Sequence, residues 1–360
     1  MIRVIPFDER DEDSRRAILR PYLKLLAMGT RFDGKALIAL GQKFGFSEEE
    51  ATRVVGKTEK EQVDFPESRT RDYLYRDGDL NVDRLYTLLT VPMVKEIWGE
   101  SRIPDEVIRD SHAADFFVYK NISGKPEMYD FTRAMKTPVC PYCNRVFTST
   151  IQEDDGKTVV RPEIDHFMSK SVYPIFSMSI MNWIPSCPIC NRRKGTNENL
   201  LYPYLEEVGA NCTFETSPVD ASRGIFLTGQ ENSEESFEIV CAIHENIPDA
   251  SAYAPLTKRL KAKDISTDKV KEEYIKRLRN SANLFGWHAV AQSHKAYVLK
   301  MYRREYAFGK AYQNSLTRSF HELFTDESLT YLRSIKRENW GESPLSKLTY
   351  DIDQEIKGLR

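Results

Sequence analysis

A chain of 360 residues is longer than a typical single domain, so its length predicts two or three folded units. Hydrophobic residues make up 41% of the chain and charged residues 29%, which is typical of a soluble globular protein. No run approaches the roughly 18 consecutive apolar residues of a membrane span, and the first residues do not resemble a signal peptide. Six cysteines, four of them in close pairs, favour a reducing compartment, and we expect the cytoplasm.

The net charge of −2 does not by itself indicate a nucleic-acid partner, but the charge is unevenly distributed. Residues 256–320 carry 15 Lys and Arg against 5 Asp and Glu, and residues 133–200 carry a smaller positive excess. Phosphate-binding proteins often concentrate positive charge in this way while their total charge stays near zero. Solvated helix faces give the same pattern, so both interpretations stay open.

Residues 1–132 are predicted to form a helical section that binds a partner or a substrate. Apolar residues recur at close to 3.6-residue spacing over residues 11–27, which indicates an amphipathic helix. Ser47 is followed by three glutamates, which is typical of a capped helix start, and residues 81–89 suggest another short helix.

Two Cys-x-x-Cys pairs dominate the middle of the chain, Cys140 with Cys143 and Cys187 with Cys190. Four thiolates in two such pairs suit a tetrahedral zinc ion, because each pair can turn both sulfurs towards one point. Zinc with four thiolate ligands has no open position for water, so we expect a structural ion. A redox role for these cysteines is the poorer interpretation, since the two pairs frame one insert.

The local element order predicted around these cysteines is strand, strand, helix. Residues 146–151 have strand propensity, and a turn signal follows them. Residues 158–164 are predicted to return as the second strand, with Asp165 and His166 at its end. Residues 187–194 are predicted to begin a helix that Gly195 interrupts or ends.

The order Asp165-His166, then Asn182, then Asn191 directly after the last cysteine, resembles the HNH endonucleases, which have a ββα-metal fold. The resemblance covers about residues 139–195, one sixth of the chain. Lys170 and the run Asn191-Arg-Arg-Lys are also similar to that family. Members whose site is framed by cysteines occur among bacterial restriction-like and anti-phage defence nucleases, including the nuclease subunits of Septu-type systems.

The resemblance implies metal-dependent hydrolysis of phosphodiester bonds, and the residue types agree with that chemistry. His166 is the expected general base, because imidazole accepts a proton near neutral pH. Asp165 and Asn191 are the expected oxygen ligands of a Mg²⁺ or Mn²⁺ ion distinct from the zinc. Asn182 matches an asparagine that usually braces the loop in this family. Glu163 is a further candidate for orienting the site.

Five basic residues lie near these ligands in the sequence and are candidates for phosphate contacts, namely Arg145, Lys170, Arg192, Arg193 and Lys194. DNA is the commoner substrate in the family, although the motif itself does not separate DNA from RNA. The sequence has no Walker A loop or Rossmann fingerprint, so control by ATP would require an ATPase subunit as partner. A single site nicks one strand, and a double-strand break would need a homo-oligomer or two events.

The predicted architecture is therefore α+β and mainly helical, with a small ββα-metal (HNH) nuclease domain stabilised by zinc at residues 133–200. Residues 201–360 are predicted to be mixed and then basic and helical, with strands at 224–228 and 236–240 and a long helical run after Pro255. Cys212 and Cys241 stand alone and are interpreted as ordinary small residues. The alternative function is a zinc-ribbon-like nucleic-acid-binding module without catalysis.

Overall fold

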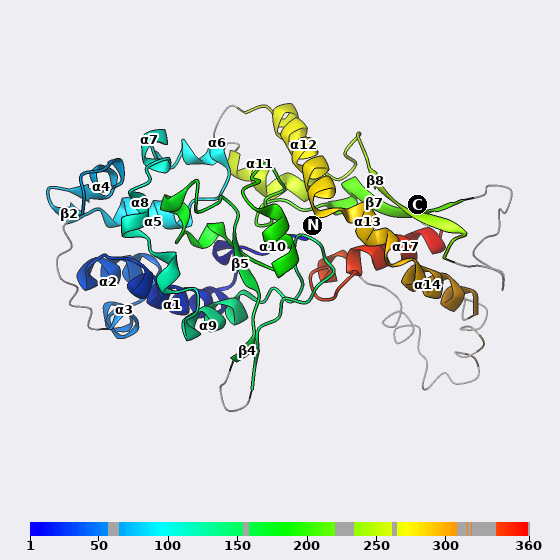
Figure 1. Ribbon diagram of the computed structural model, residues 1–360, viewed down its shortest axis with the longest axis horizontal. Helices are drawn as coiled ribbons and strands as arrows, with labels where there is room; N and C mark the ends of the chain where they lie inside the picture. Colours follow the sequence, from blue (N-terminus) through cyan, green and yellow to red (C-terminus); the bar gives the residue numbers. More distant parts are fainter. Residues whose placement is uncertain are drawn as a thin grey trace.

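The computed structural model describes residues 1–56, 65–153, 158–219, 234–260, 265–307, 315, 318 and 336–358. Over these residues the chain is mainly helical, with four two-stranded antiparallel sheets (Figure 1). The predicted α+β, mainly helical class is therefore confirmed. None of the helices in these ranges has the length and apolar character needed to cross a membrane.

Helices form the end of the molecule that is blue and cyan in Figure 1. The predicted helix starts are confirmed, because Asp11 accepts a hydrogen bond from the Ser14 amide at 2.9 Å, and Ser47 and Glu50 form a capping box. The elements here are α1 (Glu12–Gly29), α2 (Gly34–Lys43), α3 (Glu48–Val55), α4 (Arg69–Leu74), β1 (Tyr75–Arg76), β2 (Asp79–Leu80), α5 (Val82–Thr90), α6 (Lys95–Trp98), α7 (Asp105–Ile108), α8 (Ala113–Phe116) and α9 (Pro126–Met135).

The middle part of the chain forms two further sheets and one helix. These elements are β3 (Ile151–Gln152), β4 (Thr158–Val160), β5 (Glu163–His166), β6 (Trp183–Ser186) and α10 (Pro188–Lys194). Strand β5 pairs antiparallel with β6, with His166 opposite Trp183. Asp165 and His166 are the last residues of β5, but the single strand predicted at 158–164 is divided between β4 and β5, which belong to different sheets. The predicted pairing of residues 146–151 with residues 158–164 is much shorter in the structure, where only the short strands β3 and β4 pair. Strand β6 lacks polar alternation because all four of its residues are buried, so its sequence does not indicate a half-exposed strand.

The rest of the described chain forms one more sheet and further helices, and this sheet lies towards the opposite end (Figure 1). They comprise β7 (Cys212–Pro218), β8 (Phe237–Ile243), α11 (Ala254–Leu260), α12 (Thr267–Phe285), α13 (Trp287–Gln292), α14 (Lys295–Ala307) and α17 (Ser346–Ile356). Strand β8 confirms the predicted strand at 236–240, while residues 224–228 lie outside the described residues. The long run after Pro255 is divided, because Gly286 adopts a φ of +62° and ends α12.

Short 3-10 helices connect these elements. They are η1 (Phe7–Glu9), η2 (Tyr119–Asn121), η3 (Pro174–Phe176), η4 (Ile180–Asn182), η5 (Gly209–Asn211), η7 (Ala250–Tyr253) and η8 (Arg337–Asn339). Two of them, η3 and η4, lie in the loop between β5 and β6 and give it regular structure.

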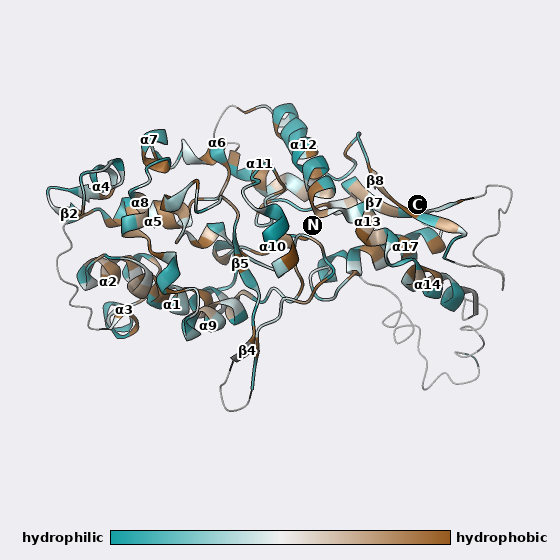
Figure 2. Cartoon of the chain, viewed as in Figure 1, coloured by the Kyte–Doolittle hydropathy of each residue, from teal (hydrophilic) through white to brown (hydrophobic). Residues whose placement is uncertain are grey.

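One hydrophobic core runs from the N-terminal helices into the central sheet. The ring of Trp183 in β6 packs edge-on against the rings of Tyr22 in α1 and Phe131 in α9, with centroid-to-centroid distances of 5.5 Å and 5.2 Å. This core includes buried residues from Met1 through Trp287, and the helices of Figure 2 carry both hydrophobic and hydrophilic residues as amphipathic helices do. The division into 1–132, 133–200 and 201–360 stays a prediction, and all three sections contribute to one core.

Candidate metal centre and the adjoining acid-histidine site

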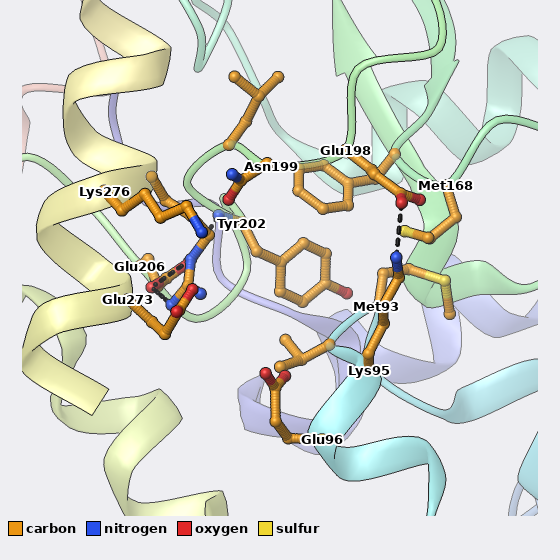
Figure 3. Close-up of a pocket in the computed structure, with 14 residues that line it drawn as sticks. Met93, Lys95, Glu96, Met168, Glu198, Asn199, Tyr202, Glu206, Glu273 and Lys276 are labelled. Carbon is orange, nitrogen blue, oxygen red and sulfur yellow. Dashed lines mark hydrogen bonds and ion pairs between the residues drawn. The ribbon is translucent and has the colours of Figure 1, made fainter. Parts of the chain in front are cut away.

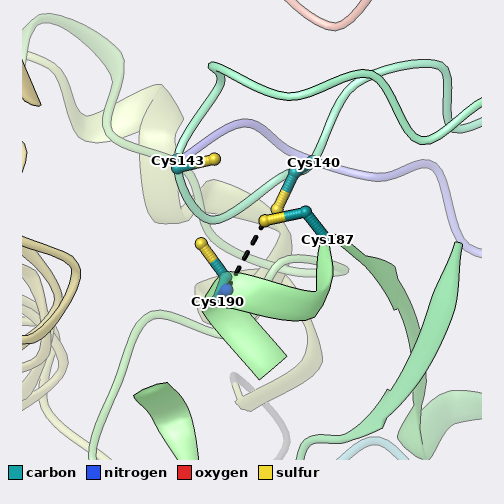
Figure 4. A group of neighbouring side chains, drawn as sticks. All are labelled: Cys140, Cys143, Cys187 and Cys190. Atoms are coloured by element: carbon teal, nitrogen blue, oxygen red, sulfur yellow. Dashed lines mark hydrogen bonds between the residues drawn. The ribbon is translucent and has the colours of Figure 1, made fainter. Parts of the chain in front are cut away.

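The four paired cysteines meet in space although 43 residues separate Cys143 from Cys187 in the sequence. Their Sγ atoms all lie within 4.8 Å of one another, with Cys140 and Cys143 on a loop and Cys187 and Cys190 at the start of α10 (Figure 4). Tetrahedral zinc at about 2.3 Å from each sulfur would place the thiolates about 3.8 Å apart. The donor set and its spacing therefore fit zinc. In the part of the chain that the structure describes, no other group of three or more His, Cys, Asp or Glu side chains is close enough to share a metal.

The backbone around the first cysteine pair is held from the C-terminal side of the chain. Asn144 adopts a φ of +50°, and its side chain donates to the Trp340 carbonyl at 2.8 Å and accepts from the Lys347 amide at 3.0 Å. Its carbonyl also accepts from the Leu345 amide. The turn that presents Cys143 is therefore fixed by a segment 200 residues further along.

Asp165 is a buried carboxylate with a partner on each oxygen. Tyr142, which lies between the first two cysteines, donates its hydroxyl to Oδ2, and the Lys194 ammonium is 3.3 Å from Oδ1. Burial raises the pKa of Asp165, and the charge of Lys194 opposes that rise. Tyr142 was not predicted from the sequence, and it connects the cysteine cluster directly to the acid.

Lys194 was predicted to contact phosphate, and its position in the structure contradicts that prediction. Its side chain has no exposed surface, and its Nζ also donates to the His166 carbonyl at 3.0 Å. Burial lowers the pKa of this ammonium, while Asp165 raises it. A phosphate cannot reach this buried group, so Lys194 is not a phosphate contact in this structure. The helical spacing carried a signal, because Lys194 lies one turn after Cys190 and faces the same interior.

The buried pair gives a first prediction. Replacing Lys194 with Met leaves the Asp165 charge buried without its cation, and we expect a destabilisation of about 3–5 kcal/mol at pH 7. The loss should shrink as the pH is lowered towards 4, because the pKa of Asp165 is raised in the folded state and a protonated Asp165 needs no counter-ion. Urea unfolding at several pH values measures both effects.

Arg192 provides the matched control on the same helix. Its side chain is exposed, so Arg192→Met should change stability by no more than about 0.5 kcal/mol. Equal destabilisation by the two substitutions at pH 7 would contradict the structural role assigned to Lys194.

His166 is buried and held in one tautomer. It is 8% exposed, and its Nε2 is 2.9 Å from the Ser177 carbonyl oxygen, which can only accept a hydrogen bond. Nε2 therefore carries the proton, and in the neutral ring the lone pair is on Nδ1. Burial, with the charge of Lys170 next, lowers the pKa of His166 to about 3, so the ring is neutral at physiological pH. Tyr119 from η2 packs against the imidazole at 4.4 Å.

Asn191 is oriented by Glu163. The Asn191 Nδ2 donates to Glu163 Oε2 at 2.8 Å, which leaves the amide oxygen as the group that can bind a cation. Glu163 and Asp165 are two residues apart in β5 and so face the same side of the sheet. Carboxylate and amide oxygens are the donors that Mg²⁺ and Mn²⁺ prefer, and each Asp165 oxygen retains a further lone pair. These residue types fit such an ion.

Asn182 braces the loop between β5 and β6. Its Oδ1 accepts from the Met168 amide at 2.7 Å, and its Nδ2 donates to the carbonyls of Met168 and Phe176, both at 3.0 Å. The side chain has no exposed surface. Because its amide is occupied by loop backbone, Asn182 serves the shape of the loop and does not face a substrate.

The other predicted basic residues lie nearer the surface. Arg192 and Lys170 are exposed, and the Lys170 ammonium stands 4.5 Å from the Tyr119 ring centroid. Arg145 is half-buried, and Arg193 donates to the Leu284 carbonyl.

Two exposed lysines of the segment that follows Tyr119 were not predicted as candidates. Lys120 and Lys125 line a surface groove of about 730 Å³ together with Asn121 and Gly124. They come from the helical section and not from the cysteine-framed segment, so no motif indicated them. Lys120 directly follows Tyr119, whose ring contacts His166, so the chain connects this groove to the acid-histidine site.

A cavity of about 290 Å³ adjoins the loop after His166 and is bordered by α6 and α12 (Figure 3). Phe167, Met168 and Tyr202 form part of its wall. Its main charges are paired within the wall, Lys95 with Glu198 at 2.5 Å and Arg277 with Glu206 at 2.6 Å. The wall also holds Glu96, Glu273 and Lys276, so acidic and basic groups are mixed in it and no cluster of a single charge selects a ligand.

Comparison with known proteins gives one distant relative. A stretch of 111 residues, 31% of this chain, is 25% identical to the Septu protein PtuB of Bacillus thuringiensis. The matched stretch spans 37% of that relative's length, so the chain matches little more than a third of it. No protein-family model matches the chain, and no solved structure matches it significantly.

Proposed function

We propose that this protein is a metal-dependent endonuclease of the HNH type that hydrolyses phosphodiester bonds of DNA. The observation that carries the proposal is the arrangement of Asp165 and His166 at the end of β5, beside a helix that the cysteine cluster holds and that carries Asn191. A strand, a second strand and a helix follow one another here, which is the order that the HNH resemblance implies.

The chemistry assigns each residue a separate task. His166 accepts a proton from the attacking water at Nδ1, because Nε2 is held by Ser177. Asp165 and Asn191 would hold a Mg²⁺ or Mn²⁺ ion, which when bound stabilises charge on the scissile phosphate and the leaving oxygen. Glu163 keeps the oxygen of Asn191 turned away from its own carboxylate. The zinc would be structural and would fix α10 against β5.

Exposed cations beside His166 would bind the phosphate backbone. The Lys170 ammonium lies over the Tyr119 ring that packs on His166, and Arg192 is an exposed residue of α10. Lys120, which follows Tyr119 in the chain, lines an exposed groove together with Lys125. Each such contact contributes affinity that falls with salt and carries no sequence information.

The function is tested with the zinc-loaded full chain and supercoiled plasmid. We expect nicked circles to form when Mg²⁺ or Mn²⁺ is added and not when it is omitted. Asn191→Ala should slow nicking at least tenfold, because it removes an oxygen ligand of the added ion. Retention of DNA without any cleavage would instead favour the zinc-ribbon-like binding module.

The similarity to the Septu protein supports a setting in anti-phage defence, together with an ATPase subunit that controls cleavage. The sequence itself lacks a nucleotide-binding signature. An ATPase should then co-purify with the tagged chain and change its cleavage rate. If the isolated chain cleaves ordinary DNA at its full rate, and adding that ATPase does not change the rate, the proposal of an ATPase partner is contradicted.

A further inference from the structure

Two cysteines outside the metal cluster form a close pair. Cys212 in β7 and Cys241 in β8 are separated by 28 residues in the sequence, yet their Sγ atoms are 3.2 Å apart. The strand register places Cys212 opposite Ile243 and Cys241 opposite Phe214, so the two thiols are diagonal neighbours on one face of the hairpin. Neither belongs to the four-cysteine group.

The two thiols differ in surroundings. Cys212 is buried, whereas Cys241 is half-buried and faces solvent in part. The contact between the two sulfurs, with burial next, raises the pKa of Cys212, and the same contact lowers the pKa of Cys241. Because the thiolate is the nucleophilic form, Cys241 is the sulfur that both meets solvent and reacts more readily.

The hairpin is held in place by α17, so the pair is not a chance approach of loose ends. The Phe214 amide donates to Asp351 Oδ2 and the Thr216 amide to Glu355 Oε2, each at 2.9 Å. The sulfurs need to approach by only about 1 Å to reach the roughly 2.05 Å length of a disulfide.

We propose that Cys212 and Cys241 form a thiol–disulfide site that hydrogen peroxide oxidises, separately from the zinc cysteines. The Cys241 thiolate attacks one peroxide oxygen, the O–O bond breaks, and hydroxide leaves, which gives a sulfenic acid. The Cys212 sulfur then attacks the Cys241 sulfur, the S–O bond breaks, and the oxygen leaves as water with the remaining proton. One peroxide gains two electrons, and two thiols become one disulfide.

The site should be reversible. Diagonal neighbours in a hairpin have Cα atoms about 7–8 Å apart, beyond the common disulfide range of about 4.4–6.8 Å, so closing the bond also requires a small movement of the strands. A bond closed across that separation is more readily reduced than a structural disulfide. A thiol reductant should therefore restore both cysteines.

The test uses the full, zinc-loaded chain treated with hydrogen peroxide, blocked with N-ethylmaleimide, digested and examined by mass spectrometry. We expect a linked peptide pair containing Cys212 and Cys241, about 2 Da lighter than the two thiol peptides together. The pair should disappear after dithiothreitol, and zinc content should not change. A zinc content that falls before the link forms, or a link confined to the zinc cysteines, would overturn the proposal.

Single substitutions assign the two roles. In Cys212→Ser the Cys241 sulfenic acid has no thiol to condense with, so dimedone should label it. In Cys241→Ser the buried Cys212 should remain a thiol at the same peroxide dose. Dimedone labelling of Cys212 in place of Cys241, or N-ethylmaleimide labelling of both cysteines in the peroxide-treated wild-type chain, would equally reject the site.

Discussion

Substituting Cys187 with Ser is expected to remove the zinc and to destabilise the centre of the molecule by about 3 kcal/mol or more. Cys187 is the N-cap of α10, and its sulfur also accepts from the Cys190 amide at 3.4 Å. Structural zinc contributes about 10–16 kcal/mol to the folding of small zinc-finger peptides. We expect a smaller loss here, because the packing of the large hydrophobic core also stabilises this part of the molecule.

The loss should extend beyond the cluster. Tyr142 lies between two ligands and bonds Asp165, while Lys194 follows Cys190 by one turn and pairs with the same acid. Metal analysis and thermal unfolding measure the effect. Cys241→Ser is the matched control, since Cys241 lies outside the group and should keep a full equivalent of zinc. A Cys187→Ser chain with one equivalent of zinc and an unchanged melting temperature would contradict a four-cysteine site.

Local signals predicted much of this fold. Asp11 and Ser47 carry the short polar side chains that cap helices, and both cap the expected ones. The cysteine spacing predicted a cluster that the structure assembles, because two i, i+3 pairs need only one approach between them. Gly195 ends α10 as expected.

The features that sequence did not reveal depend on contacts between distant segments. Strand β6 is buried on both faces and contains Pro185, so it lacks the alternation that marks a strand. Lys194 follows two arginines and looks like part of a basic surface, but only Arg192 and Arg193 of the three are exposed. Even the hydropathy view shows α10 as largely hydrophilic (Figure 2). Which basic side chain of α10 is buried depends on which face of the helix the cysteine cluster holds against the core.

Contacts between distant segments also determine the surroundings of Asp165, which its position in the sequence does not indicate. Its position at a strand end predicts a metal ligand, and the structure in addition pairs this carboxylate with a phenol and an ammonium. Both partners come from the cysteine-bearing segments, Tyr142 between the first pair and Lys194 one turn after the second. The four cysteines and the acid-histidine site therefore form one connected unit.

His166→Ala is expected to lower metal-dependent plasmid nicking by about 10²- to 10⁴-fold, the range that a general base supplies. The Ser177 carbonyl that His166 bonds also accepts from Trp183 Nε1 at 2.8 Å, so it keeps a partner in the variant. Stability should therefore fall only modestly, by about 1–2 kcal/mol. Zinc content and affinity for DNA should stay close to those of the wild-type chain.

The pH dependence separates this role from a structural one. Burial lowers the pKa of His166 to about 3, below its unfolded value of about 6.5, so the folded state loses stability as the pH falls from about 6.5 towards 3. That part of the acid sensitivity should disappear in His166→Ala. Between pH 6 and 8 the ring is already neutral, so protonation of His166 should not reduce the wild-type nicking rate there. His112 is exposed, and His112→Ala is the control that should leave nicking unchanged. If both His166→Ala and the control His112→Ala nick plasmid at the wild-type rate, the proton acceptor must be another group. The HNH assignment of this site then fails.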